Sequence, residues 1–138
     1  MSDATVLERN KRLIQEHFDA IWSGDDAQIR SQLAQNFIDH TQTAKGSGPE
    51  AAIEWARAMR QVFPDMKVTI EQAVAERDRV AVYATWRATH KGAFQGIAPT
   101  NKAISFTGMV LWRIEDGKIT DRWAVIDMAH AIRQLQDG

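Results

Sequence analysis

Three side chains are candidates for proton transfer: Asp127, His90 and His40. Removal of a proton next to a carbonyl group needs a base, and the enolate oxygen that develops needs a hydrogen-bond donor. A carboxylate enclosed by apolar side chains has a raised pKa because burial disfavours its charged form, and this brings it closer to the working pH of a base. We therefore expect Asp127 to be the base, with His90 or His40 as its partner.

Each of these candidates also has a structural role open to it. Asp127 directly precedes an amphipathic segment, 128–135, and aspartate is a favoured N-cap residue of helices. His90 ends a strand-like run before a Gly-containing loop, so a position at a pocket mouth and a hydrogen bond to the backbone fit the sequence equally. His40 follows two apolar residues and is expected to line the pocket. His17 lies among apolar residues at helical spacing and is interpreted as a core or interface residue.

Large apolar side chains are expected to contact the ligand, and the predicted set is Trp123, Trp86, Phe94, Phe106 and Met59. The two tryptophans of this set lie on strands near the candidate acid/base groups, although tryptophans are more often ordinary core residues. Trp22 and Trp55 lie on predicted helices, and Trp112 is expected to face a partner chain. Arg122, next to Asp121, either orients an anionic ligand or forms a surface ion pair.

The composition indicates one soluble domain. A chain of 138 residues is the usual size of one domain, so 1–138 is expected to form a single core. The 17 Lys and Arg residues nearly balance 18 Asp and Glu, a formal charge of -1, so nucleic acid is not an expected partner. The chain has no cysteine and no closely spaced metal-ligand pattern, so no metal is expected. No segment resembles a signal peptide or reaches the ~18 apolar residues of a membrane helix, which predicts a cytoplasmic protein without a membrane partner.

Helical spacing dominates the first half of the chain. A capping-box pattern at its start and a glycine after its end predict a long amphipathic helix over 5–23. A shorter helix over 26–34 is expected next, followed by an extended segment, 37–40, and a Gly/Ser/Thr-rich connector, 41–48. Prolines at both ends bound a third helix over 49–63.

Alternation with a period of two replaces helical spacing in the second half. Strands are expected over 66–76, 79–90, 105–114 and 119–127, with an Asp-Gly hairpin signal before the last one. The tail, 128–135, returns to helical spacing. The fold class is therefore α+β, with three N-terminal helices packed on a strongly curved antiparallel sheet and a short C-terminal helix.

The predicted sheet has apolar residues on both of its faces. One face of the 79–90 strand carries Val80, Val82, Ala84 and Trp86, and the other carries Ala81, Tyr83 and Thr85. The helices cover one of these faces. The other needs a second cover, and a second copy of the chain is the simplest one, so a homodimer is predicted.

Several short motifs occur in an order that resembles one known family. They lie at 21–25, 37–40, 48–50, 63–65, 78–80, 89–100 and 115–119, followed by Trp123 and Asp127. The chain resembles the SnoaL-like polyketide cyclase family, within the nuclear transport factor 2-like fold. The resemblance implies a cone-shaped α+β barrel, open at one end and often dimeric, with a cofactor-free pocket. It also implies intramolecular aldol condensation on a small apolar or aromatic carbonyl compound, with an aspartate as acid/base.

One part of the family pattern is missing from the chain. Many relatives have His-Trp-Asp in the middle of the last strand, whereas this chain has Arg122, Trp123 and Ala124. Only Asp127 remains to carry the acidic role. The function stays open between a cofactor-free cyclase or isomerase-like lyase, a non-catalytic binding protein, and an isomerase or hydrolase on the same fold. Sites of the steroid-isomerase type use tyrosine donors, and the chain has one tyrosine, Tyr83.

Overall fold

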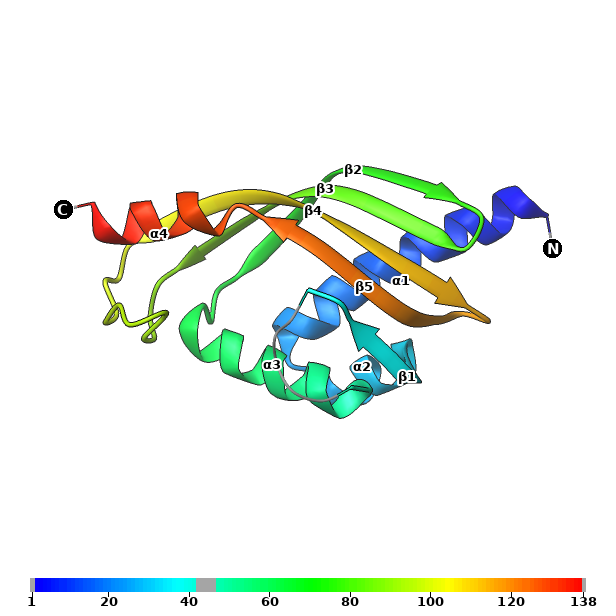
Figure 1. Ribbon diagram of the computed structural model, residues 1–138, viewed down its shortest axis with the longest axis horizontal. Coiled ribbons are helices and arrows are strands. Elements are labelled where there is room, and N and C mark those ends of the chain that lie inside the picture. The colour runs from blue at the N-terminus through cyan, green and yellow to red at the C-terminus, as the bar shows by residue number, and fades with distance from the viewer. Residues whose placement is uncertain (1, 42–46, 138) are drawn as a thin grey trace.

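The computed structural model describes residues 2–41 and 47–137 (Figure 1). Within these residues it contains four helices and five strands. In chain order they are α1 (Asp3–Ser23), α2 (Asp26–Gln32), β1 (Leu33–Asp39), α3 (Pro49–Val62), β2 (Lys67–Glu76), β3 (Arg79–Thr89), β4 (Ala103–Glu115), β5 (Lys118–Ile126) and α4 (Met128–Gln136). The predicted α+β class and the order of helices and strands are confirmed. The predicted connector, 41–48, lies largely outside the described residues.

Local signals at the ends of α1 explain its length. The Ser2 hydroxyl accepts a hydrogen bond from the Thr5 backbone N–H at 3.2 Å and caps the first turn. The helix thus begins before the predicted cap at Thr5. Gly24 ends it in the left-handed conformation with φ 81°, which glycine adopts without the steric cost of a Cβ atom.

The helix α2 is shorter than predicted. Asp25 caps its first turn by accepting a hydrogen bond from the Gln28 backbone N–H, as expected. Leu33 was predicted to continue the helix, and this is wrong, because Leu33 already belongs to β1 and pairs with Ile119 of β5. Leu33 and Ile119 are both buried, so packing and strand pairing outweigh a local helical pattern.

The five strands form one sheet in the order β1-β5-β4-β3-β2. Strands β2 to β5 form the predicted antiparallel meander, whereas β1 pairs with β5 in parallel. Figure 1 shows the sheet curving over α1, with α2 and α3 on its concave side and α4 at the opposite end from the N-terminus. A Cβ atom at Gly108 of β4 would lie 2.8 Å from the Val125 carbonyl oxygen, so only glycine allows the close approach of β4 and β5 there.

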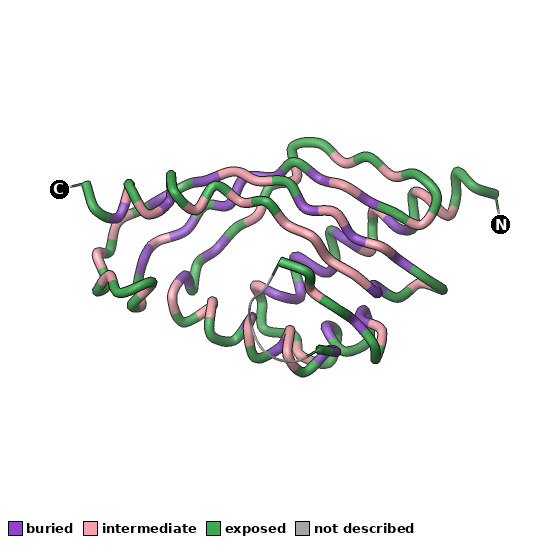
Figure 2. The backbone as a smooth tube through the Cα atoms, viewed as in Figure 1, coloured by how far each residue is buried: buried purple, intermediate pink, exposed green. Residues whose placement is uncertain are grey.

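The core lies between the concave face of the sheet and the helices (Figure 2). Alternate residues of β3 and β4 point into it and meet the apolar faces of α1 and α3. The buried residues at this contact include Val80, Val82, Trp86, Val110, Trp112, Ile14, Phe18, Ile21 and Ile53. Each side chain of this size contributes roughly 1.5–3 kcal/mol when it is fully removed from water.

The convex face of the sheet carries an exposed apolar row. Tyr83, Met109 and Val125 lie side by side on β3, β4 and β5, because their Cα atoms pair across the sheet. Their exposed fractions are 40%, 57% and 79%. The observation agrees with the expectation that a second cover is needed, and the homodimer stays a prediction. Among the described residues, no helix is long and apolar enough to cross a membrane.

Candidate active site

A central cavity opens between the concave face of the sheet, α1, β1 and the N-terminal part of α3. Its volume is about 80 Å³, which is room for a few water molecules. Six of the lining residues are aromatic: Phe18, Trp22, Phe37, Trp55, Trp86 and Trp112. Three ionisable side chains from different elements complete the lining: His17 of α1, Asp39 of β1 and Arg122 of β5.

His17 is held in the neutral state. Its side chain is only 6% exposed, and its Nδ1 lies 2.8 Å from the Oε1 atom of Gln32. The pKa of His17 is lowered to about 4, mainly by burial. The hydrogen bond to Gln32 opposes this shift, and the positive charge of Arg122 adds to it. The imidazole is therefore uncharged at neutral pH.

Arg122 and Asp39 form an ion pair at the cavity. Nη1 of Arg122 donates to Oδ2 of Asp39 at 2.8 Å, and both side chains are mostly buried. The Thr41 backbone N–H donates to the other carboxylate oxygen, Oδ1, at 3.1 Å. The guanidinium carbon of Arg122 lies 5.8 Å from the centre of the Trp55 ring, within the range of a cation–π contact. The predicted surface ion pair of Arg122 with its neighbour Asp121 is not formed, because Arg122 bonds to Asp39 instead.

Asp127, the predicted base, lies away from the central cavity. It is exposed and forms the N-cap of α4, where its Oδ1 accepts a hydrogen bond from the His130 backbone N–H at 3.0 Å. Enclosure by apolar side chains was the physical reason for expecting a base at this position, and Asp127 is not enclosed. The geometry therefore corrects the expectation of a buried acid and corresponds to the alternative capping role.

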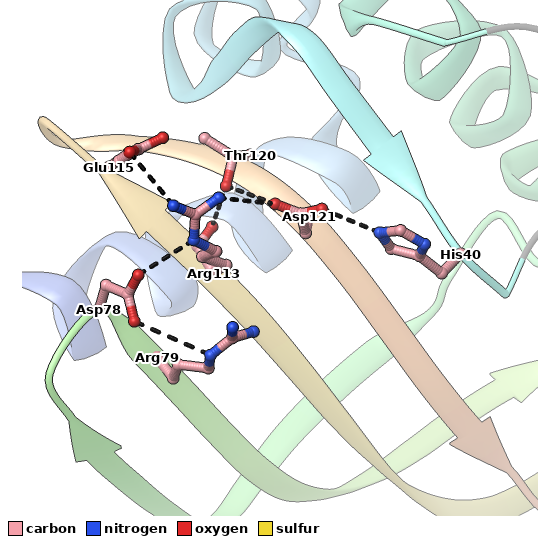
Figure 3. Close-up of polar contacts among 7 residues, drawn as sticks. All are labelled: His40, Asp78, Arg79, Arg113, Glu115, Thr120 and Asp121. Carbon is pink, nitrogen blue, oxygen red and sulfur yellow. Dashed lines mark hydrogen bonds and ion pairs between the residues drawn. The ribbon is translucent and has the colours of Figure 1, made fainter.

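His40 points to the outer side of the sheet (Figure 3). Its Nε2 lies 2.8 Å from Oδ2 of Asp121, and its ring stacks on Trp123 with the ring centres 4.6 Å apart. Burial opposes ionisation of Asp121, but the hydrogen bonds from His40 and Thr120 outweigh it and lower the pKa of that carboxyl. Asp39, one residue earlier, lies in the cavity instead. The alternation of Phe37 and Asp39 on one face of β1 was the sequence signal that could have identified it.

His90 is enclosed at the end of β3 rather than in the cavity. It has no exposed surface, and its Nδ1 accepts a hydrogen bond from the Thr100 backbone N–H at 3.1 Å. Its backbone N–H donates to the Lys102 carbonyl, and its carbonyl accepts from Asn101, so it ties the two ends of the β3–β4 loop together. Its Nε2 is buried without a hydrogen-bond partner among the described residues. His90 thus corresponds to the alternative of a strand-end histidine that is hydrogen-bonded to the backbone.

Four of the five residues predicted to contact the ligand lie outside the lining of the central cavity. Trp86 lines the central cavity, as expected. Phe106 stacks on Trp86 with ring centres 5.9 Å apart, Phe94 packs on Phe63 near the β3–β4 loop, and Trp123 lies on the outer face beside His40. Met59 packs against the core outside the cavity lining.

Three other tryptophans were missed as lining residues: Trp22, Trp55 and Trp112. Trp112 was expected to face a partner chain, yet it is buried on the concave side. Its neighbour across the sheet is Arg122, and strand register of this kind was not evident from the sequence. No group of three metal-ligating side chains occurs among residues 2–41 and 47–137.

A curved sheet wrapped over helices around an apolar cavity is the architecture of the nuclear transport factor 2-like class of α+β proteins. The model of the SnoaL-like polyketide cyclase family matches residues 12–135, and the chain belongs to this family. No match was found among curated protein sequences.

Solved structures with the same fold include several at more than a quarter identity. AclR from Streptomyces galilaeus, a candidate hydroxylase, is 27% identical, with a TM-score of 0.83 over 94% of this chain and 97% of that chain. IdmH from Streptomyces antibioticus, a candidate polyketide cyclase, is 26% identical, with a TM-score of 0.81 over 92% of this chain and 98% of that chain. A candidate SnoaL-like polyketide cyclase from Jannaschia sp. CCS1 has a TM-score of 0.88 at 19% identity, over 100% and 99% of the two chains, which shows the fold alone.

The missing family carboxylate has a defined place in this structure. Ala124 lies on β5 between Arg122 and Ile126, and alternation puts these three residues on the same face of the strand. Both of its neighbours on that face line the cavity. A carboxylate at position 124 would therefore belong to the cavity side of the sheet, where this chain has a methyl group.

Proposed function

We propose that the protein is a cofactor-independent enzyme that transfers protons on a small, largely apolar carbonyl compound, by aldol-type ring closure or a related step. The observation that supports this is the pairing of a neutral imidazole with a guanidinium group in one aromatic cavity. His17 supplies a lone pair, and Arg122 supplies hydrogen-bond donors for a developing negative oxygen.

Proton transfer from the substrate would proceed through His17 and Arg122. The C–H bond next to the carbonyl breaks, its proton goes to Nε2 of His17, and its electron pair moves to the carbonyl oxygen. One N–H of Arg122 is bonded to Asp39, and a guanidinium has five, so others remain to bind the enolate oxygen. In ring closure, the enolate carbon attacks a second carbonyl, whose oxygen takes the proton back from His17. No co-reactant is needed.

The low pKa of His17 is compatible with this role. Burial and the charge of Arg122 disfavour the imidazolium before an enolate forms. Formation of an enolate beside the ring adds an opposite charge at short range, which stabilises the imidazolium in a site of low dielectric constant. The base therefore becomes stronger as the substrate loses its proton.

The charges of the cavity favour an uncharged substrate. Arg122 and Asp39 compensate each other, and the other lining side chains are uncharged. A permanently charged ligand would be buried without a counter-ion, which costs several kcal/mol. A planar, uncharged carbonyl compound avoids this cost and contacts the tryptophan rings.

A non-catalytic binding protein is the second candidate function, and Ala124 favours it, because the family carboxylate is missing from the cavity side of β5. An isomerase with a tyrosine donor is disfavoured, since Tyr83 lies on the convex face. Both remaining functions use the same cavity, so ligand binding alone does not separate them.

Deuterium exchange at the α-carbon of 2-tetralone, an uncharged bicyclic ketone, tests for the enzyme. NMR in D₂O would follow the exchange with wild-type protein, with His17→Gln, and with His130→Gln as a control on the exposed side of α4. We expect the wild type and His130→Gln to accelerate exchange at least tenfold above buffer, and His17→Gln to fall to the buffer rate. Quenching of tryptophan fluorescence by 2-tetralone without accelerated exchange would instead support the binding protein.

A further inference from the structure

We infer that Gln32 is a positioning residue that fixes His17 with its proton on Nδ1, so that Nε2 meets the ligand only as an acceptor. The tautomer follows from the packing of α2 against α1. Its use in proton transfer rests on the proposed function.

The side chain of Gln32 is placed by its position in the chain. It is the last residue of α2, and Leu33, which follows, is paired with Ile119 in the sheet. Helix and strand therefore hold the backbone of Gln32 from both sides. Its side chain is only 3% exposed, so it has no freedom to turn toward solvent. The 2.8 Å contact to Nδ1 of His17 is thus built into the fold rather than made by a mobile side chain.

Hydrogen-bond chemistry then selects the tautomer. A neutral imidazole has one donor nitrogen and one acceptor nitrogen, and an amide oxygen only accepts. Because Oε1 of Gln32 faces Nδ1, that nitrogen carries the proton and Nε2 carries the lone pair. The structure has no hydrogen bond to Nε2 from residues 2–41 or 47–137, so this lone pair is available to a ligand in the cavity.

The surrounding charges favour the same orientation of the Gln32 amide. A reversed amide would donate to Nδ1 and put the ring proton on Nε2. Arg122 from β5 is the positive group that acts on His17, and Asp39 from β1 is bonded to it. The lining residues from α3, β3 and β4 are uncharged: Ala51, Ala52, Trp55, Trp86 and Trp112. A lone pair on Nε2 is attracted by the guanidinium, whereas an N–H there is repelled.

A ligand must therefore offer two different groups to the cavity. It has to present a hydrogen-bond donor, either a hydroxyl or an acidic C–H, to His17. It also has to present an acceptor oxygen to Arg122. A β-hydroxy carbonyl compound, or the dicarbonyl from which it forms, has this pair of groups.

NMR of the imidazole nitrogens tests the positioning role without a substrate. Two-bond ¹H–¹⁵N correlation spectra would be recorded at pH 7 for wild type, Gln32→Glu and Gln32→Leu. Gln28→Glu is the matched control, since Gln28 is an exposed residue of the same helix. We expect wild type and Gln28→Glu to show a protonated Nδ1 and an unprotonated Nε2 at His17.

The two variants at position 32 should change the ring in different ways. In Gln32→Glu the carboxylate accepts the Nδ1 proton and stabilises the imidazolium, which has a proton on both nitrogens, so a larger fraction of His17 should have a proton on Nε2 at pH 7 than in the wild type. In Gln32→Leu the acceptor is lost, so both tautomers become populated. A wild-type His17 with its proton on Nε2 would overturn the inference, even if neither variant folds. Retention of the wild-type pattern in Gln32→Leu would also overturn it.

The 2-tetralone measurement separates this inference from the proposed function. An unprotonated Nε2 without any accelerated exchange would leave the positioning role intact and remove the enzyme. Exchange that depends on His17, together with a proton on Nε2 in the resting protein, would support the enzyme and remove the positioning role of Gln32.

Discussion

Replacement of Asp127 separates its capping role from a catalytic one. Its carboxylate accepts the His130 backbone N–H and caps α4, which packs on the sheet through Ala131 and Leu135. Loss of an N-cap side chain costs roughly 0.5–2 kcal/mol. Because Asp127 is exposed and water replaces part of the lost bond, we expect about 1 kcal/mol for Asp127→Ala, which is a fall in Tm of roughly 3–4 °C for a chain of this size.

Asparagine at the same position provides the control. Asparagine and aspartate cap helices about equally well, and only the small interaction with the helix dipole, about 0.3–1 kcal/mol, is lost. Asp127→Asn should therefore lower the Tm by only about 1–3 °C, and both variants should keep the 2-tetralone exchange rate. Thermal unfolding followed by circular dichroism measures the first quantity. Loss of exchange in Asp127→Asn at unchanged Tm would refute the capping account and make Asp127 the base.

Three further predictions concern the charges and the convex face. The pKa of His17 is about 4 in the folded state and about 6.5 in the unfolded state, so the unfolded chain binds more protons between these pH values. Urea unfolding should therefore show that the free energy of unfolding falls by about 3 kcal/mol from pH 7 to pH 4, and His17→Gln should reduce this fall. Arg122→Met should lower the free energy of unfolding by about 2 kcal/mol, because Asp39 would lose its ion pair with Arg122. This is less than the loss expected for a fully buried pair, and an unchanged urea midpoint would contradict it. Light scattering at micromolar concentration should give the mass of a dimer, and Val125→Asp should give a monomer; a monomeric wild type would contradict the predicted cover of the convex face.

The sequence predicted the architecture well because its signals are local. The change from helical spacing to alternation, the caps and the Asp-Gly hairpin each act within a few residues, and the structure contains the elements they predict. The parallel pairing of β1 with β5 joins residues far apart in the chain, and no local pattern encodes it. The same pairing shortened α2, since Leu33 is buried in the sheet rather than in the helix.

The cavity was predicted only in outline for the same reason. His40 was chosen where Asp39 lies in the cavity, because a shift of one residue in a strand exchanges its two faces. His17 was interpreted as a core residue, and in burial it is one. Its chemistry depends on Gln32 and Arg122, which approach it only in the folded chain. Asp127 was predicted to be the base because it is the acid that remains at the end of the last predicted strand, and the same position in the sequence fits an N-cap.

The pH dependence of 2-tetralone exchange tests most directly whether a neutral His17 is the proton acceptor. We predict that the rate above buffer stays constant from pH 8 to pH 5 and falls only as the pH approaches the pKa of His17, about 4, where the ring gains its proton. A fall centred near pH 6.5, the ordinary value for an exposed histidine, or an equal rate in His17→Gln, would contradict the account.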